Sequence, residues 1–416
     1  MGFHTYSTPY DWSRVAAFRA AAAAYPGGSV DLSIGSPVDP VPEGVRKALA
    51  DASNARNAYG YPATVGTADL RQAISQWYAR DRGVDLTALG ATAVPSVGSK
   101  EAVALMASML HLQPGDVVVQ PRVAYPTYAI GTQLAGATVK LVDAVEDTAS
   151  WEHTKGVKAI WVNSPNNPSG KTLNAFQLHD IVMAARRIGA VVLSDECYAL
   201  LAWRGANATV TAGGQPVVST NAGAPAVAGY AARDADPSAD SGMGLASVAA
   251  PSILDPGVCA GSAQGILALY SLSKQSNMAG YRVAFIAGDK DLVDPMAALR
   301  KQIGLIIPGP VQAAMACALD DDDTVLAQRR KYLSRLAALV DGLKAFGYED
   351  AAIPDGGLYV WVKAQGKDCW DDMDVLAELG IVPAPGEFYG DDGYLRFSVT
   401  ASDEAVNRAA HRLRGA

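Results

Sequence analysis

The chain has 416 residues, of which 50% are hydrophobic and 18% are charged, a composition typical of a globular protein with ample apolar material for a core. Its formal net charge is −8, from 34 Lys and Arg against 42 Asp and Glu, and it has no lysine-rich arm, so we expect no nucleic-acid partner. The four cysteines lie far apart and the five histidines do not cluster, so the sequence predicts neither a disulfide framework nor a metal site.

The beginning of the sequence, MGFHTYSTPYDWSRV, lacks the basic and apolar regions of a secretory signal. The alanine run at 20–24 is too short to span a membrane, and no segment elsewhere reaches about 18 uninterrupted apolar residues. We therefore expect a cytoplasmic protein that does not contact a membrane.

Short apolar runs alternate with helical patterns as far as residue 310. The predicted strands, in chain order, are 116–121, 158–165, 190–196, 265–274 and 282–289. Because these runs are continuous and rich in β-branched residues, they suit a sheet that is covered on both faces and is therefore mostly parallel.

Helical patterns lie between these strands, and after Pro310 the regular alternation of strand and helix ends. The predicted helices are 99–112, 174–189 and 289–303. Beyond them, a long helical stretch precedes strands at 356–363 and 393–399 and a final amphipathic helix, which is typical of a smaller α+β domain. Residues 204–251, rich in Ala, Gly and Pro, show little periodicity and are predicted to be a surface insertion.

Polar segments follow the predicted strands: NSPNNPSG, SDECY and SLSK, while SVGSKE leads into the helix at 99–112. Ligands of open α/β sheets bind beyond the carboxyl ends of the strands. Lys274 of SLSK is the unusual residue, because lysine is seldom fully buried and desolvation disfavours its charged form. A lysine in this place either extends its ammonium to water or is required as a neutral amine.

Together with LSIGSPVDPVPEGV at 32–45 and YLRFSV at 394–399, these segments resemble the fold-type I aminotransferases, which use pyridoxal 5′-phosphate (PLP). The resemblance covers nearly the whole chain. It implies an α/β fold with a mostly parallel sheet between helices and a smaller α+β domain. The domains implied are an N-terminal segment contributing to the small domain, a large PLP-binding domain and a C-terminal small domain, over residues 1–45, 46–310 and 311–416.

The resemblance implies catalytic roles for Lys274, Asp195 and Tyr198. Lys274 would bond to the cofactor aldehyde and later move a proton. Asp195 would keep the ring nitrogen protonated, and Tyr198 and Asn167 match residues that hydrogen-bond the phenolic oxygen of the cofactor. In isolation, Asp195 would be interpreted as a helix cap and Asn167 as part of a turn.

The phosphate of the cofactor requires hydrogen-bond donors and positive charge, which a helix N-terminus and an arginine provide. The residues that the resemblance assigns to it are Gly98, Ser99, Lys100, Ser271, Ser273 and Arg282. Tyr125 is expected to stack on the ring, with Tyr128 as second choice, although either could be a core tyrosine. Tyr61, in YGYPATVGTADLR, matches a tyrosine that reaches the phosphate of the neighbouring subunit, which implies a homodimer with shared active sites.

Arg396 of YLRFSV matches the arginine that binds the substrate α-carboxylate, and a solvated strand arginine is the alternative. Gly35 would let the backbone approach the same carboxylate, and Asn167 is also expected to contact the substrate.

Within the family, VDLSIGSPVDPVP, PRVAYPTY and SDECYALLAW resemble actinobacterial N-succinyldiaminopimelate aminotransferases. The implied reaction exchanges the amino group of N-succinyl-LL-2,6-diaminopimelate with 2-oxoglutarate, in lysine and diaminopimelate biosynthesis. Both small-molecule substrates carry a distal acid, so a second cation should line the pocket; Arg122 and Arg14 are candidates by position only.

Other functions use the same scaffold. Alanine, aspartate or aromatic transamination and carbon–sulfur β-elimination rely on the same lysine and aspartate, so the cofactor residues do not separate them. A PLP-binding sensor domain of a transcription regulator is disfavoured, because about 30 residues before LSIGSP cannot hold a DNA-binding domain.

Overall fold

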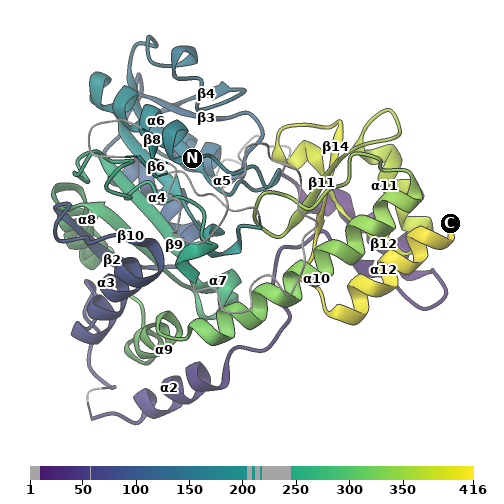
Figure 1. The fold of residues 1–416 in the computed structure, drawn as a ribbon, viewed down its shortest axis with the longest axis horizontal. Helices are drawn as coiled ribbons and strands as arrows, with labels where there is room; N and C mark the ends of the chain where they lie inside the picture. Colours follow the sequence, from purple (N-terminus) through teal and green to yellow (C-terminus); the bar gives the residue numbers. More distant parts are fainter. Residues whose placement is uncertain (1–9, 57, 204–208, 211–215, 218–244) are drawn as a thin grey trace, which may run out of the picture.

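The computed structural model describes residues 10–56, 58–203, 209–210, 216–217 and 245–416. A seven-stranded sheet forms the centre of the larger part of the molecule (Figure 1). Its strands, in spatial order, are β2 (Ala91–Val97), β10 (Val283–Asp289), β9 (Ile266–Ser271), β6 (Val191–Asp195), β5 (Val157–Asn163), β3 (Val117–Pro121) and β4 (Thr138–Val142). Strand β10 is antiparallel to both of its neighbours, and the pairings among the other strands are parallel. The predicted mostly parallel sheet is confirmed.

The strands that the sequence analysis missed, β2 and β4, lie at the two edges of this sheet. Strand β2 contains Pro95, which has no N–H to donate and is tolerated in a sheet chiefly at an edge. In strand β4 only Val142 is buried, and Lys140 interrupts the apolar residues, so β4 lacks the continuous apolar run of a central strand.

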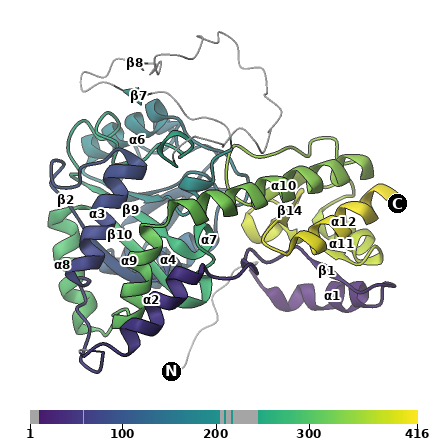
Figure 2. The same cartoon turned by 60° about the horizontal axis from the view of Figure 1, so that its bottom comes forward.

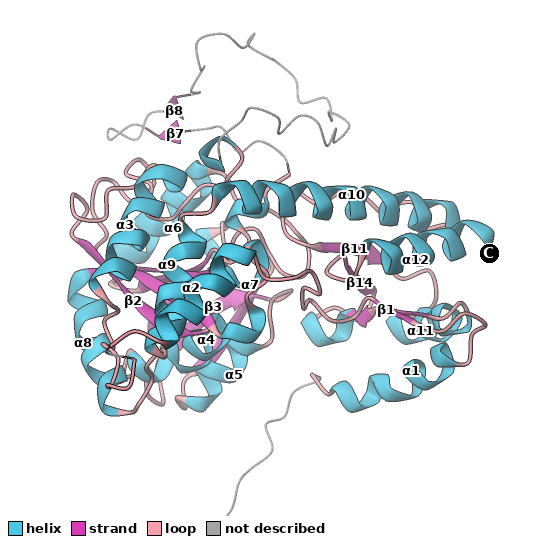
Figure 3. Cartoon of the chain, turned by 90° about the horizontal axis from the view of Figure 1, so that it is seen from below, coloured by secondary structure: helices cyan, strands magenta, loops and turns pink. Residues whose placement is uncertain are grey.

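Helices cover both faces of the sheet (Figure 3). One face carries α3 (Ala68–Arg82), α6 (Ala175–Ile188) and α9 (Gly309–Leu319), and the other carries α4 (Ser99–Met109), α5 (Thr127–Leu134) and α8 (Lys290–Gln302). Successive residues of one strand point into opposite cores: Ala268 and Tyr270 of β9 belong to the first, and Leu267 and Leu269 to the second. This explains why the central strands are apolar without alternation.

A third hydrophobic core lies in the smaller part of the molecule, on the right in Figure 1. It is built from α10 (Asp322–Phe346), α11 (Cys369–Glu378), α12 (Asp403–Gly415) and a three-stranded sheet of β11 (Tyr359–Lys363), β14 (Tyr394–Ser398) and β13 (Ala384–Pro385). The long helix α10 extends from the larger part into the smaller one (Figure 2).

The N-terminal segment joins this third core. Helix α1 (Ala16–Ala23) contributes Ala22, and β1 (Val30–Asp31) pairs in parallel with β12 (Ile381–Val382). Helix α2 (Glu43–Ser53) instead packs on α9. The chain thus crosses between the two parts just after β1, and this crossing carries residues 33–36 past the carboxyl ends of the central strands.

The predicted insertion at 204–251 falls largely outside the described residues. The structure describes only a short hairpin of β7 (Thr209–Val210) and β8 (Pro216–Val217), and residues from the 3-10 helix η5 (Leu245–Ser247) onward. Among the described helices, none is long and apolar enough to cross a membrane.

Candidate active site

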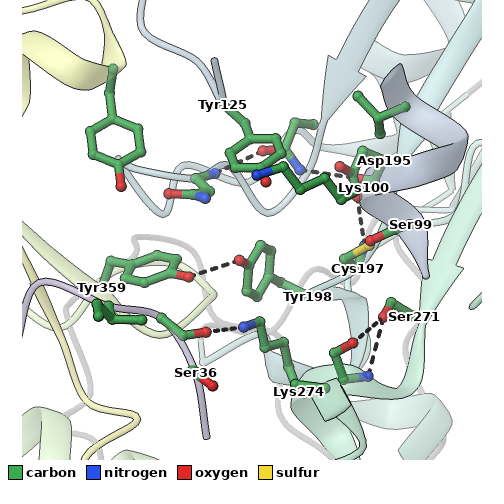
Figure 4. A pocket seen from close by; sticks show the side chains of 18 of the residues that line it. Ser36, Ser99, Lys100, Tyr125, Asp195, Cys197, Tyr198, Ser271, Lys274 and Tyr359 are labelled. Carbon is green, nitrogen blue, oxygen red and sulfur yellow. Dashed lines mark hydrogen bonds between the residues drawn. The ribbon is translucent and has the colours of Figure 1, made fainter. Parts of the chain in front are cut away.

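A cavity of about 500 Å³ opens at the carboxyl ends of β5, β6 and β9, where the two parts of the molecule meet (Figure 4). Every predicted site residue except Gly98 and Tyr61 lines it. These residues are Gly35, Ser99, Lys100, Tyr125, Asn167, Asp195, Tyr198, Ser271, Ser273, Lys274, Arg282 and Arg396. The tertiary structure therefore brings together residues that are up to 361 positions apart in the chain (396 − 35 = 361).

Lys274 lies in the short helix α7 (Leu272–Gln275), directly after β9. Its Nζ donates to the carbonyl oxygen of Gly35, on the segment that crosses the strand ends. Burial lowers the pKa of the Lys274 amine below its usual value, and the positive charges of Arg396 and Arg282 act in the same direction. The lowered pKa makes the neutral amine, which a nucleophile or a base requires, easier to form than in water, although the nearby Tyr359 hydroxyl opposes this shift.

Asp195 is the last residue of β6 and is buried. Its Oδ2 accepts a hydrogen bond of 2.8 Å from the Tyr128 hydroxyl, and its Oδ1 accepts one of 3.1 Å from the Cys197 backbone N–H. No cation among the described residues pairs with it. Burial raises its pKa, an effect that these two hydrogen bonds offset only partly.

The role of Tyr128 differs from the one considered in the sequence analysis. Its ring stacks on Trp161 with centroids 4.6 Å apart, while its hydroxyl points at Asp195. The hydroxyl of Tyr128 therefore orients the carboxylate. Tyr125, the preferred stacking residue, lines the cavity.

A buried pair of tyrosines lies beside Lys274. The hydroxyls of Tyr198 and Tyr359 are 2.9 Å apart, and Tyr359 comes from β11 in the smaller part of the molecule (Figure 4). Burial alone would raise the pKa of Tyr359, but the charges of Lys274 and Arg396 lower it overall. Tyr359 was missed in the sequence analysis, because GGLYVWVK marks a strand but not which of its residues face another domain.

Arg396 is buried on β14. Its two terminal nitrogens donate to Asn167 Oδ1 at 2.9 Å and to the Ser33 carbonyl at 2.7 Å, while its Nε has no partner. Its guanidinium lies 4.0 Å from the centre of the Tyr359 ring. In the part of the chain that the structure describes, no carboxylate forms an ion pair with this arginine, which leaves a buried positive charge open to an anionic ligand.

The glycine beside this arginine is closely packed against Tyr359. A Cβ at Gly35 would lie 2.2 Å from the Tyr359 hydroxyl oxygen, so any side chain there would displace the tyrosine. The close approach also brings the Gly35 carbonyl oxygen within hydrogen-bonding distance of Lys274 Nζ.

A cradle of donors occupies the opposite end of the cavity. Gly98, with φ of 76°, precedes the first turn of α4, and a Cβ on it would lie 2.2 Å from Nη2 of Arg282. Ser271 Oγ is 2.8 Å from Ser273 Oγ. Free N–H groups of a helix N-terminus, two hydroxyls and a guanidinium are the donor set that a phosphate requires.

Lys100 also lines the cavity, whereas Tyr61, Arg122 and Arg14 lie outside it. The ammonium of Lys100 lies 5.9 Å from the centre of the Tyr10 ring. Tyr61 is fully exposed and outside the cavity. Arg122 and Arg14 form ion pairs with Asp143 and Glu387 at 3.0 and 2.7 Å, and neither lines the cavity.

The residues present fit PLP. An unpaired buried carboxylate at the strand ends suits a protonated ring nitrogen, the buried amine of Lys274 with its lowered pKa suits an aldehyde, and the donor cradle around Gly98 suits a phosphate. The fold and the site together define a fold-type I, PLP-dependent enzyme.

Residues 28–413 match the family "Aminotransferase class I and II", and the chain belongs to this family. Its members are PLP-dependent and act on amino and keto acids, so the chain is a PLP-dependent aminotransferase. The predicted family, fold class and cofactor are thereby confirmed.

Two curated relatives and one solved structure extend this result. The chain is 38% identical over 406 residues to "4-dedimethylamino-4-oxo-anhydrotetracycline transaminase OxyQ" from Streptomyces rimosus, covering 97% of this chain and 98% of that protein. It is 40% identical over 407 residues to "Probable aminotransferase Rv1178" from Mycobacterium tuberculosis, covering 97% and 84%. The structure of a "probable N-succinyldiaminopimelate aminotransferase" from Thermus thermophilus superposes with a TM-score of 0.76 at 24% identity, covering 97% and 99%, which shows the same fold.

Proposed function

We propose that this aminotransferase transfers the amino group of N-succinyl-LL-2,6-diaminopimelate to 2-oxoglutarate, as a cytoplasmic enzyme of lysine and diaminopimelate biosynthesis. The observation that carries the proposal is the positive charge of the cavity. Its lining contains a single carboxylate, Asp195, against four permanently charged side chains, Arg19, Lys100, Arg282 and Arg396, besides the amine of Lys274. Both proposed substrates carry an acid remote from the reacting carbon, and a cationic cavity favours them over neutral amino acids.

The proton transfer is assigned to Lys274. Bound PLP withdraws electrons from the substrate Cα. The neutral Nζ of Lys274 takes the proton from Cα of the amino donor and, in the reverse direction, returns a proton to Cα of the product. The Gly35 carbonyl, which accepts a hydrogen bond from this Nζ, keeps the amine directed toward the cavity.

Three further groups of residues are assigned to binding. Asp195 holds the proton on the ring nitrogen, and Tyr198 and Asn167 bind the phenolic oxygen of the cofactor. The donor cradle, with Lys100, holds the phosphate, and Tyr125 stacks on the ring. Arg396 binds the substrate α-carboxylate together with Gly35 and Asn167, and the existing Asn167–Arg396 hydrogen bond of 2.9 Å supports this assignment.

We assign Tyr61 to the active site of a second subunit in a homodimer. Its complete exposure leaves it available for a partner. If sites are shared, mixing the Tyr61→Ala and Lys274→Ala proteins restores activity above the sum of the two, because one site per mixed dimer is intact. Separate sites would leave the mixture at that sum.

A second candidate function is amination of a larger aromatic ketone. The name of the Streptomyces relative describes a transaminase of an oxo-anhydrotetracycline. In this chain Tyr10 and Trp12 give the cavity an aromatic wall against which a large apolar acceptor could pack.

A panel of amino donors with 2-oxoglutarate, scored by the glutamate formed, tests the proposal. We expect the highest kcat/KM with N-succinyl-LL-2,6-diaminopimelate. Glutamate from alanine or an aromatic donor, with none from the succinylated donor, would overturn the substrate assignment. Pyruvate and ammonia from cystathionine would indicate β-elimination, and turnover only with polycyclic ketones would favour the second candidate.

A further inference from the structure

The cations of the cavity outnumber the anionic groups that the proposed function places there. The proposed function assigns Lys274 to proton transfer, Arg396 to the α-carboxylate, and Arg282 with Lys100 to the doubly charged phosphate. Asp195 is matched by the ring nitrogen. One cation of the lining, Arg19, is left without a ligand.

Arg19 lies on α1 and is held in place through two of the three nitrogens of its guanidinium. Its Nε donates to Asp31 Oδ2 at 2.9 Å, and its Nη2 donates to Ser33 Oγ at 3.1 Å. The other carboxylate oxygen of Asp31 accepts from the Ser33 backbone N–H at 2.9 Å, so the anchor is itself fixed. An arginine held in this way loses little freedom when it binds a further group.

The third nitrogen of the Arg19 guanidinium is available. Its Nη1 has no hydrogen-bond acceptor within the described ranges, and the side chain is 33% exposed at the cavity. The Trp12 ring flanks it, with its centre 5.5 Å from the guanidinium carbon. Because Asp31 already neutralises part of the charge, binding at this nitrogen depends on directed N–H groups, which select a carboxylate by geometry.

Arg19 and Arg396 are connected through a single residue. Arg396 donates to the carbonyl oxygen of Ser33 at 2.7 Å, and Arg19 donates to its Oγ at 3.1 Å. Since these two atoms belong to one serine, the donating nitrogens lie within roughly 10 Å of each other. This upper limit places both arginines within reach of the two carboxylates of one short dicarboxylic acid.

We propose that Arg19 binds the distal carboxylate of a dicarboxylic substrate of the size of glutamate or 2-oxoglutarate, while Arg396 holds its α-carboxylate. Arg19 is then a specificity-determining residue for the amino acceptor. The inference rests on the proposed function for the role of Arg396, but it does not depend on which amino donor is used. A longer donor would extend its distal acid past Arg19 toward the cavity mouth.

The test compares Arg19→Gln with Arg14→Gln in the PLP-loaded enzyme. Arg14 precedes α1 and also pairs with a carboxylate, but it does not line the cavity, so it is a matched control. Glutarate and pentanoate, two unreactive acids of equal length, are titrated by calorimetry. We expect Arg19→Gln to weaken glutarate binding about ten- to a hundredfold and pentanoate binding less than about twofold. Arg14→Gln should change neither.

A kinetic readout accompanies the titration. In Arg19→Gln, kcat/KM for 2-oxoglutarate should fall by the same factor, while that for 2-oxobutyrate is unchanged. Equal losses for both acids, or no loss of glutarate binding, would overturn the proposal. The proposal would also be overturned if Lys100→Gln lost the preference for glutarate over pentanoate while Arg19→Gln kept it.

Two outcomes separate this inference from the proposed function. If N-succinyl-LL-2,6-diaminopimelate is not a donor but Arg19→Gln still loses glutarate selectivity, the inference stands and the substrate assignment fails. If Arg19→Gln does not fold, Arg19→Lys serves instead, because it keeps the charge but not the planar fork; it should lose part of the glutarate affinity, and retention of full affinity would overturn the proposal.

Discussion

Two consecutive acids at the end of β6 have opposite surroundings. Glu196 forms a buried ion pair with Arg82 at 2.9 Å and also accepts hydrogen bonds from the Ser252 hydroxyl and from the Ile253 N–H at 2.7 Å. Asp195 faces the cavity with two neutral donors, Tyr128 and the Cys197 N–H. One carboxylate is thus fully satisfied by the protein, and the other is not.

This difference separates structural charges from functional ones. Arg335 repeats the structural pattern with Asp39 and Asp403, and Arg300 repeats it with Glu101. Asp195 and Arg396 in the cavity, in contrast, form no ion pair within the described chain, whereas Arg19 is paired with Asp31. Because an unpaired buried charge is costly, its presence indicates that a ligand completes the site.

The largest effect is expected from Lys274→Ala, which removes the cavity amine and its proton transfer. We expect kcat to fall at least about 10⁴-fold, the upper range for a lost acid–base group. The absorbance of the lysine-bound cofactor should also disappear. Lys290→Ala, an exposed lysine paired with Asp294, is the control and should keep both. Turnover in Lys274→Ala near the wild-type rate would remove the basis of the functional assignment.

Glu196→Gln tests the structural side of the comparison. The amide keeps most hydrogen bonds but leaves the Arg82 guanidinium buried without a counter-charge, so we expect a loss of about 3 kcal/mol of stability. Urea unfolding followed by tryptophan fluorescence measures it. The folded variant should keep kcat within a few-fold, because Glu196 does not line the cavity.

A double variant sharpens this prediction. Arg82→Met combined with Glu196→Leu removes both charges and should recover most of the lost stability, since apolar replacements of a buried pair are often near neutral. If the double variant is less stable than Glu196→Gln, packing rather than charge pairing accounts for the loss.

Asp195→Asn should give the converse result. We expect kcat/KM to fall about a hundredfold, because the ring nitrogen loses its anionic partner. The cofactor-free protein should be no less stable than wild type at neutral pH, since the variant removes an uncompensated buried carboxylate. A destabilisation similar to that of Glu196→Gln would contradict the distinction between the two acids.

The smallest effect is a pH dependence of the cofactor-free protein. Burial raises the pKa of Asp195 in the folded state above its usual value of 3.8. Between the unfolded-state pKa and the folded-state pKa, the folded state therefore binds more protons than the unfolded state. The contribution of this group to stability is present below the unfolded pKa and is lost as pH rises through the folded one. The difference in unfolding midpoint between wild type and Asp195→Asn, measured from about pH 4 to 8, should therefore shift in favour of the variant as pH rises. A difference that does not change with pH would contradict the raised pKa.

The sequence by itself determined the central strands, the helices between them and the polar residues at the strand ends, because these depend on local periodicity and chain order. Lys274 stood out in this way, whereas the roles of Asp195 and Arg396 came from the resemblance to the aminotransferases. Some boundaries moved: the helix predicted at 99–112 ends at Met109, and the chain turns with a φ of 55° at His111. The edge strands β2 and β4 lacked the apolar run that identifies a buried strand.

Only the tertiary structure decided which distant side chains meet. Tyr128 contacts Asp195 across 67 residues, and Tyr359 contacts Tyr198 across 161. Arg19 reaches the cavity only because β1 pairs with β12 and fixes the N-terminal segment at the strand ends. None of these contacts leaves a local pattern, because a tyrosine or an arginine on a helix or strand has the same spacing whether it packs in a core, faces water or lines an active site. The packing of the two parts of the molecule determines which of these surroundings each side chain has.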